Sequence, residues 1–264
     1  MNDSAQLARN LYLDLLRDVL INKIYNDPSI KPVKKSSIPQ LLGLAGTALD
    51  FTFENRERGL DWPTVAHSMI GARRMDNLRH CVSRVIEDNI PGDLIETGVW
   101  RGGACIMMRG VLKAYGVTNR KVWVADSFAG LPKPDKKYSA DKGDEHHQYE
   151  ALAVSQEQVA TNFERYGLLD DQVCFLKGWF RDTLPKAEID RLAVLRLDGD
   201  MYESTMDALK ALYPKVSPGG FVIVDDYVMI HGCRKAVHDY LAEHNEQPEI
   251  KQIDGAGVFW RIPA

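Results

Sequence analysis

The segment DLIETGVWRGGACIM, residues 93–107, joins a short apolar strand, a glycine-rich turn and the start of an amphipathic helix. Leu94 and Ile95 predict the strand, which ends on Glu96. Glycine in the turn permits positive φ and lets a ligand approach the main chain, while the N–H groups that open the helix point at the bound molecule. The segment therefore predicts a ligand site, although a plain strand–turn–helix connection would look the same. Its spacing, E-x-G-x-x-x-G, differs from the dinucleotide fingerprint G-x-G-x-x-G.

The chain beyond this segment alternates between apolar strands and helical stretches, which is the pattern of a parallel sheet covered by helices. After the first strand, four further apolar segments predict parallel strands: residues 121–127, 173–176, 192–197 and 221–224. Two shorter segments, Ile250–Ile253 and Val258–Arg261, are joined through glycines and predict a closing antiparallel hairpin. We therefore expect an α/β, Rossmann-like fold with a seven-stranded, mostly parallel sheet.

The first 60 residues have a different pattern and predict a helical and irregular cap on a larger domain that spans residues 61–264. A helix is expected over residues 6–25, and its apolar side needs a partner. That side carries Leu7, Leu11, Leu15, Val19 and Leu20. Residues 29–59 predict an irregular segment with an apolar patch at Leu41, Leu42 and Leu44. A second helix is expected to open at Asp61-Trp62-Pro63-Thr64.

Composition limits the classes of protein to which the chain can belong. With 264 residues, 45% of them hydrophobic, it can bury a substantial core. A net charge of −4 and the lack of any basic block argue against a nucleic-acid partner. The four cysteines are far apart and lack a zinc spacing, which favours reduced thiols in a cytoplasmic protein. No signal peptide or long apolar run is present, so we expect no membrane association.

Acidic side chains end four of the predicted strands. They are Glu96, Asp126, Asp198 and the pair Asp225-Asp226. The carboxyl ends of parallel strands meet at one edge of an open α/β sheet, and ligands bind in the crevice beyond that edge. Five acids at one edge repel one another and lose hydration, so a cation, a donor-rich ligand or bound protons must compensate their charge.

The position of each acid indicates its chemistry. Asp126 ends the second strand, where a carboxylate can accept hydrogen bonds from both hydroxyls of a ribose, although it could also cap the following loop. Asp198, Asp225 and Asp226 offer only hard oxygen ligands, which suits Mg²⁺, Mn²⁺ or Ca²⁺ and not zinc. A divalent ion there could grip a substrate hydroxyl, lower its pKa and orient it. Asp200 is expected to cap a helix or to support these acids.

Several other residues have two interpretations each. Residues 130–152 are polar and predict a lid over the site. Within them, His146 and His147 could contact substrate, act as bases or only face solvent. Trp179 could wall an adenine ring or fill the core. Thr64 could cap the second helix or reach a cofactor.

Seven segments, in order along the chain, resemble the macrocin O-methyltransferase family. They cover roughly residue 60 to the C-terminus and are WPTVAHSMIG (62–71), GDLIETGVWRGGACI (92–106), VWVADSFAGLP (122–132), NFERYGLLDDQVCFLKGWFRDTLP (162–185), LAVLRLDGDMYEST (192–205), SPGGFVIVDDY (217–227) and CRKAVHDY (233–240). The resemblance implies a class I methyltransferase fold and S-adenosylmethionine as methyl donor. It also implies glycosylated natural products as substrates, since the family methylates sugar hydroxyls of antibiotics such as macrolides and aminocoumarins.

The resemblance also implies roles for individual residues. It implies Mg²⁺ bound by Asp198, Asp225 and Asp226, with Asp198 as the general base. Cofactor contacts carry over onto Thr64, Glu96, Thr97, Gly98, Asp126, Ser127, Ser155, Gly178 and Trp179. Ser155 also opens a capping box with Gln158, so a helix cap is its alternative role.

The first 60 residues match the family poorly. In the family this segment helps to close the acceptor pocket and to assemble the oligomer, so the departure leaves the identity of the acceptor open. We expect a homodimer or a larger homo-oligomer, because the apolar side of the first helix must be buried somewhere. An NAD-dependent or nucleotide-sugar-modifying enzyme is disfavoured by the missing G-x-G-x-x-G. A non-catalytic cofactor-binding protein is disfavoured by the three candidate metal acids.

Overall fold

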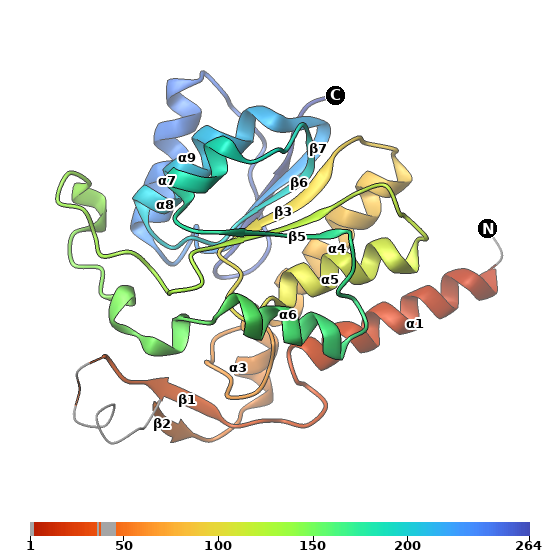
Figure 1. The fold of residues 1–264 in the computed structure, drawn as a ribbon, viewed down its shortest axis with the longest axis horizontal. Helices are drawn as coiled ribbons and strands as arrows, with labels where there is room; N and C mark the ends of the chain where they lie inside the picture. The colour runs from red at the N-terminus through yellow and green to blue at the C-terminus, as the bar shows by residue number, and fades with distance from the viewer. Residues whose placement is uncertain (1–2, 36, 38–45) are drawn as a thin grey trace.

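A seven-stranded sheet runs through the centre of the computed structural model, which describes residues 3–35, 37 and 46–264 (Figure 1). In spatial order its strands are β5 (Val173–Lys177), β4 (Val122–Asp126), β3 (Asp93–Thr97), β6 (Leu192–Leu197), β7 (Val216–Val224), β9 (Val258–Arg261) and β8 (Lys251–Gln252). Strands β3 to β7 pair in parallel, whereas β9 is antiparallel to both β7 and β8. The predicted sheet and its closing hairpin are confirmed.

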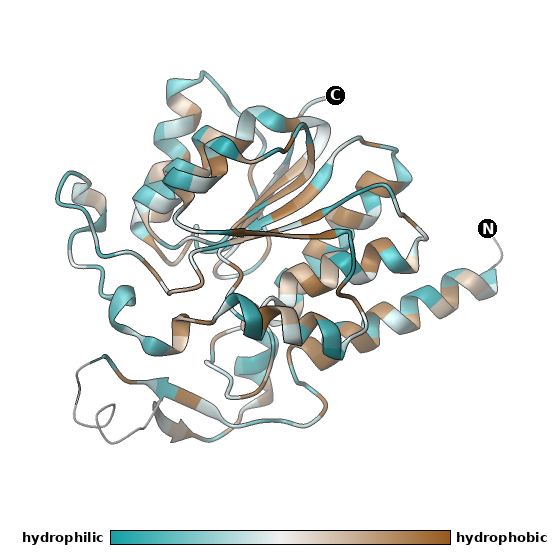
Figure 2. Ribbon diagram, viewed as in Figure 1, coloured by the Kyte–Doolittle hydropathy of each residue, from teal (hydrophilic) through white to brown (hydrophobic). Residues whose placement is uncertain are grey.

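Helices cover both faces of the sheet, which is why its central strands are mostly apolar. Strand β6, LAVLRL, is buried at every position. One face is covered by α4 (Gly71–Glu87), α5 (Gly103–Ala114) and α6 (Gln156–Arg165), the other by α7 (Phe180–Thr183), α8 (Tyr202–Leu212) and α9 (His231–Glu243). Figure 2 shows the apolar residues concentrated in the strands and on the helix sides that face them. Among the described residues, no helix has the length and apolarity needed to cross a membrane.

Helix α1 (Asp3–Leu20) packs on the outside of α5, and it is shorter than predicted. It ends at Leu20 and not at residue 25, because the chain turns through Asn22 and Asn26, which both have positive φ. Its buried residues are Leu13, Leu16 and Leu20. The side that the sequence marked as apolar is mostly open to solvent: the exposed fractions are 57–61% for Leu7, Leu11 and Leu15.

Two other N-terminal predictions are wrong. Residues 29–59, expected to be irregular, contain a hairpin of β1 (Ser29–Pro32) and β2 (Gly46–Leu49) and the helix α3 (Phe53–Arg58). The second helix was expected from residue 61 but begins at Gly71, because the preceding residues run beside β1. There the N–H of Ile30 donates to the carbonyl of Trp62 at 2.8 Å. The predicted apolar patch at Leu41, Leu42 and Leu44 lies outside the described residues.

The long segment between β4 and α6 is tied down at several points. It contains three single-turn 3₁₀ helices, Ser139–Asp141, His146–Gln148 and Glu150–Leu152. The Asp141 carboxylate accepts the first N–H groups of α8, at 2.6 Å from Tyr202 and 3.0 Å from Glu203. These two hydrogen bonds satisfy N–H groups that a helix leaves without a partner at its start. The segment also meets the N-terminal part, where Lys34 pairs with Tyr149 as an isolated bridge.

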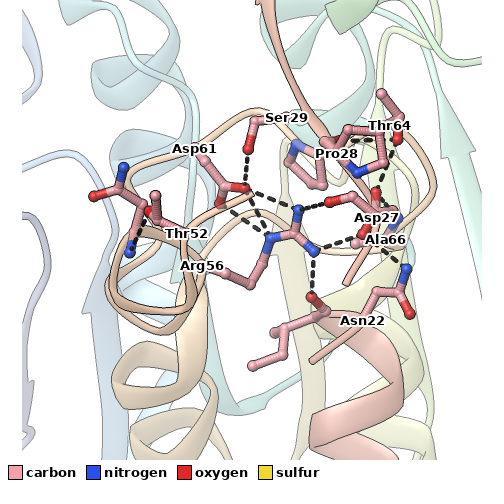
Figure 3. A network of polar contacts seen from close by, with 12 residues as sticks. Asn22, Asp27, Pro28, Ser29, Thr52, Arg56, Asp61, Thr64 and Ala66 are labelled. Atoms are coloured by element: carbon pink, nitrogen blue, oxygen red, sulfur yellow. Dashed lines mark hydrogen bonds and ion pairs between the residues drawn. The ribbon is translucent and has the colours of Figure 1, made fainter. Parts of the chain in front are cut away.

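A buried guanidinium joins the N-terminal part to the chain that enters α4 (Figure 3). Arg56 of α3 is 1% exposed and donates to Asp27 at 2.6 Å and to Asp61 at 2.9 Å. Asp27 in turn accepts the N–H of Val65 at 2.6 Å and the hydroxyl of Thr64 at 3.1 Å. The network therefore fixes residues 61–66 against α3 and against the turn that follows α1.

Replacing Arg56 with methionine should lower the free energy of unfolding by about 3–5 kcal/mol, because two buried carboxylates would lose their counter-charge. Urea denaturation followed by circular dichroism measures this loss. The matched control is Arg58→Met on the same helix, whose side chain is 55% exposed and pairs with an exposed glutamate. The control should change stability by less than about 0.5 kcal/mol. Equal losses in both variants would contradict this role of Arg56.

Candidate active site

A cavity of about 430 Å³ opens at the edge where strands β3 to β7 end. Residues that end or follow these strands line it: Glu96, Gly98, Val99, Asp126, Ser127, Gly178, Trp179, Asp198, Asp225 and Asp226. Trp62 and residues 67–70, which precede α4, and His146 from the long segment also line it. This edge is where open α/β sheets bind their ligands.

The turn after β3 passes so close to the end of β6 that only glycine fits. Gly98 has a φ of 88°, and a Cβ atom there would lie 1.7 Å from the carbonyl oxygen of Asp198. Asp126 holds the same turn, since its Oδ2 accepts the N–H of Val99 at 2.8 Å. Its Oδ1 accepts the N–H of Phe128 at 2.7 Å, so the loop-capping role of Asp126 is confirmed. Burial raises the pKa of Asp126 although these N–H groups oppose the shift.

Three carboxylates meet beside this turn. Asp198 follows β6, and Asp225 and Asp226 follow β7. Each of the three offers an oxygen, and these oxygens lie within 4.8 Å of one another. Burial and mutual repulsion raise the pKa values of Asp198 and Asp226. A partly buried set of carboxylate oxygens without sulfur or nitrogen donors fits a hard divalent ion such as Mg²⁺.

Two arginines, which the sequence analysis did not single out, compensate part of this negative charge. Arg196 lies within β6 and donates to one oxygen each of Glu96, Asp198 and Asp225. Arg74 of α4 donates to the other oxygen of Asp225. A signal for Arg196 was present in LAVLRL, because a charge inside an otherwise apolar strand requires a buried partner. For Arg74, a charge on an amphipathic helix, no comparable signal existed.

Glu96 belongs to this ionic cluster as well as to the cavity wall. Its side chain is almost fully buried, and burial raises its pKa to about 7, against the opposing effect of Arg196. The thiol of Cys105 donates to its other oxygen at 2.9 Å. The acid that precedes the glycine turn is therefore held from two sides.

Six of the nine predicted cofactor contacts line the cavity: Glu96, Gly98, Asp126, Ser127, Gly178 and Trp179. Thr64, Thr97 and Ser155 are not among the lining residues of the described chain. The Thr64 hydroxyl donates to Asp27 and, at 2.9 Å, to the carbonyl of Pro28. The side chain of Ser155 caps α6 by accepting the N–H of Gln158 at 3.2 Å.

The predicted helix caps have mixed outcomes. The cap at Ser155 is confirmed. The cap at Thr64 is wrong, because no helix begins there, and the cap at Asp200 is wrong, because the N-cap position of α8 is Met201. Asp200 instead lines the cavity with a positive φ of 57°, and burial raises its pKa to about 7. His146 lines the cavity too, with its Nδ1 2.6 Å from a carboxylate oxygen of Asp144.

Comparisons with known proteins agree with this geometry. The sequence profile of the family macrocin-O-methyltransferase (TylF) matches residues 9–262, so the expectation that the first 60 residues depart from the family is wrong. The 8-demethyl-8-(2,3-dimethoxy-alpha-L-rhamnosyl)-tetracenomycin-C 4'-O-methyltransferase of Streptomyces olivaceus is 54% identical and aligns over 97% of this chain and 94% of its own length. The mycinamicin III 3''-O-methyltransferase of Micromonospora griseorubida is 53% identical and aligns over 96% of this chain and 97% of its own.

Solved structures give the same result. The O-methyltransferase NovP superimposes with a TM-score of 0.88 at 50% identity, covering 97% of this chain and 100% of that one. The calicheamicin methyltransferase CalS11 shares the fold, with a TM-score of 0.58 at 20% identity over 71% of this chain and 78% of that one. Fold and site together define a class I, S-adenosylmethionine-dependent O-methyltransferase. The chain belongs to the macrocin O-methyltransferase (TylF) family.

His67, on the cavity wall, makes the site sensitive to acid. Its Nδ1 lies 2.7 Å from the hydroxyl of Tyr166. Burial, with Arg165 and Arg101 nearby, lowers the pKa of His67 from 6.5 to about 4. The folded protein therefore keeps this imidazole neutral in a pH range where the unfolded chain protonates it.

The contribution of His67 to stability should consequently fall as the pH drops from 6.5 to about 4, since the unfolded chain then binds a proton that the folded one excludes. At about 1.4 kcal/mol per pKa unit, a shift from 6.5 to about 4 makes this contribution about 3–4 kcal/mol. We expect His67→Gln to show a smaller loss of stability than the parent across this range in urea titrations. The exposed His80 serves as the control, and His80→Gln should keep the parent's pH dependence. Identical pH curves for His67→Gln and the parent would exclude the assignment.

Proposed function

We propose that this enzyme methylates a deoxysugar hydroxyl of a glycosylated natural product in antibiotic biosynthesis. The proposal rests chiefly on one observation: a partly buried set of three carboxylates lies beside the glycine turn of a methyltransferase fold. The relatives support the substrate class, because their names specify a rhamnosyl tetracenomycin and mycinamicin III. The names of these two relatives specify different positions, 4' and 3'', although both are nearly equally identical to this chain, so overall identity does not decide which hydroxyl is methylated.

The proposed seat of S-adenosylmethionine follows the order of the strands. Gly98 lets the methionine part pass over the turn after β3, and Asp126 accepts the ribose hydroxyls at the end of β4. Gly178 and Trp179, which follow β5, border the adenine. The long segment 130–152 is the proposed lid, because His146 reaches the cavity wall from it. The hydrogen bonds of Thr64 and Ser155 described above favour structural roles for these two residues. Cofactor contacts at Thr64, Thr97 and Ser155 stay predictions.

For the metal we propose Mg²⁺, held by Asp198, Asp225 and Asp226. When bound, such an ion lowers the pKa of a nearby hydroxyl and fixes its orientation. A neutral sugar hydroxyl is a weak nucleophile, which is why both an ion and a base are useful here. Asp198 is suited to be the base, because its carboxylate belongs to the cluster that would orient the acceptor hydroxyl.

The chemical step balances without further reactants. The acceptor oxygen attacks the methyl carbon in line with the carbon–sulfur bond, and that bond breaks with its electron pair passing to sulfur. The hydroxyl proton passes to Asp198, which leaves S-adenosylhomocysteine and the methyl ether. Closure of residues 130–152 over the cavity would exclude water and keep the two reactants aligned.

Asp198→Asn should lower kcat by about 10²–10⁴-fold, because the amide cannot accept the hydroxyl proton. Turnover is followed as S-adenosylhomocysteine formation with mycinamicin III as the probe acceptor, and S-adenosylhomocysteine affinity is followed by calorimetry. We expect that affinity to stay within a few-fold of the parent. The control Asp190→Asn changes an exposed acid before the other end of β6 and should keep full turnover. A fully active Asp198→Asn would remove the base assignment.

We further propose that residues 1–60 act as a cap on the catalytic domain of residues 61–264 and carry the subunit contact. Leu7, Leu11 and Leu15 recur every four residues and form one exposed apolar stripe on α1. An apolar stripe of this kind is suited to pack against its copy in a symmetric homodimer. A cytoplasmic location also stays a prediction, supported by four cysteines that are all free thiols.

The exposed stripe predicts the outcome of a simple assembly experiment. Leu11→Glu should shift the protein from dimer or larger assembly to monomer in light scattering coupled to gel filtration, because a charge would be buried in the contact. Gln6→Glu places the same charge on an exposed polar position of α1 and should leave the assembly unchanged. A parent protein that is already monomeric would exclude the contact.

A further inference from the structure

The guanidinium of Arg196 lies among the carboxylates that are proposed to bind the metal ion. The side chain is 1% exposed and lies inside the sheet, within β6. One of its nitrogens donates to Glu96 and, at 2.7 Å, to Oδ2 of Asp198. Its other terminal nitrogen donates to Oδ1 of Asp225. Two of the three proposed metal ligands are thus held by a single buried cation of the chain itself.

Arg74 completes this arrangement from the neighbouring helix. It donates to Oδ2 of Asp225 and, at 3.2 Å, to Asp254, and its side chain is 6% exposed. Both oxygens of Asp225 therefore already accept hydrogen bonds from arginines. Asp226 differs from its neighbour, because neither arginine donates to it.

We propose that Arg196 is a built-in counter-cation of the metal site. It keeps the ligand carboxylates in position when no ion is bound. It also weakens the affinity of these carboxylates for the metal ion, which compensates part of their charge once it binds. The inference rests on the divalent ion of the proposed function. It adds a positioning residue that touches neither the cofactor nor the acceptor in the proposed arrangement.

The physical argument has two parts. Three carboxylates at this spacing would repel one another in a poorly solvated site, so the metal-free protein needs a positive charge among them. The same charge repels an incoming divalent ion across a few ångströms of low-dielectric interior, where such repulsion is strong. Arg196 should therefore stabilise the metal-free enzyme and lower its metal affinity at the same time. An ordinary structural ion pair would stabilise the metal-free enzyme without lowering its metal affinity.

The test compares Arg196→Met with the parent, in EDTA and in a series of Mg²⁺ concentrations. In EDTA the variant should melt at a lower temperature, because its carboxylates are left uncompensated. Calorimetry with Mg²⁺ alone should show binding at least tenfold tighter than in the parent, and Mg²⁺ should raise the melting temperature of the variant more. Arg196→Lys keeps the charge and should retain the parent's Mg²⁺ affinity.

The matched control is Arg109→Met, which removes another buried arginine. The Arg109 side chain is 5% exposed and pairs with Asp170 at 2.5 Å, outside the lining of the cavity. This variant should lose stability in EDTA but bind Mg²⁺ as the parent does. If Arg196→Met does not fold even with Mg²⁺, Arg74→Met tests the same argument at the other oxygen of Asp225.

The possible outcomes separate this inference from the proposed metal site. Tighter Mg²⁺ binding in Arg196→Met, or in Arg74→Met, with an unchanged control supports the counter-cation. Equal Mg²⁺ affinity in the parent and in these variants overturns it and leaves the metal site standing. No binding of Mg²⁺, Mn²⁺ or Ca²⁺ to the parent or to any variant overturns both.

Discussion

Five carboxylates of like charge share one edge of the sheet, and the structure around them is arranged to compensate that charge. Backbone N–H groups of the turns donate to the oxygens of Asp126, while Arg196 and Arg74 donate to half of the oxygens of the other four acids. Gly98 lets the turn approach close enough for these bonds to form. Neither arginine donates to Asp226, which accepts the N–H of Asp200 at 3.3 Å, and burial together with the neighbouring acids raises its pKa. The site therefore combines a neutralised part, suited to cofactor hydroxyls, with a part suited to a cation.

Much of the fold was predictable from the sequence because its signals are local. Parallel strands covered on both faces must be continuously apolar, so segments such as LAVLRL could be placed within a residue or two. The convergence of the strand-end acids followed from topology alone. What could not be predicted depends on contacts between distant segments. Residues 61–70 look like a helix start, but Trp62 and Pro63 lie beside β1, and α8 receives its cap from Asp141, about sixty positions earlier.

The charge balance was predicted only in part for the same reason. A compensating cation, ligand or proton was expected, yet two of the compensating positive charges are arginine side chains of the protein itself. Arg196 was visible as an anomaly inside an apolar strand, whereas Arg74 is an ordinary residue of an amphipathic helix. The side of α1 that enters the core was also chosen by tertiary packing, since both sides of this helix carry leucines. In each case the long-range contact, and not the local pattern, decided the outcome.

The N-terminal part is joined to the site through the buried Arg56 network and through the segment 130–152. The network fixes the residues that enter α4, and several of the next residues line the cavity. A change in the N-terminal part can therefore reshape the cavity wall without changing any strand-end acid. This arrangement offers a physical reason why one family can keep its chemistry while it varies its acceptors.

Anomalous diffraction from crystals soaked with Mn²⁺ and S-adenosylhomocysteine tests the proposed metal site most directly. We expect one strong anomalous peak with oxygen ligands from Asp198, Asp225 and Asp226 at about 2.0–2.2 Å, the distances of a small hard cation. We also expect the ribose hydroxyls to lie on Asp126. A bound cofactor with no Mn²⁺ peak among these carboxylates, and Arg196 alone compensating them, would contradict the central claim.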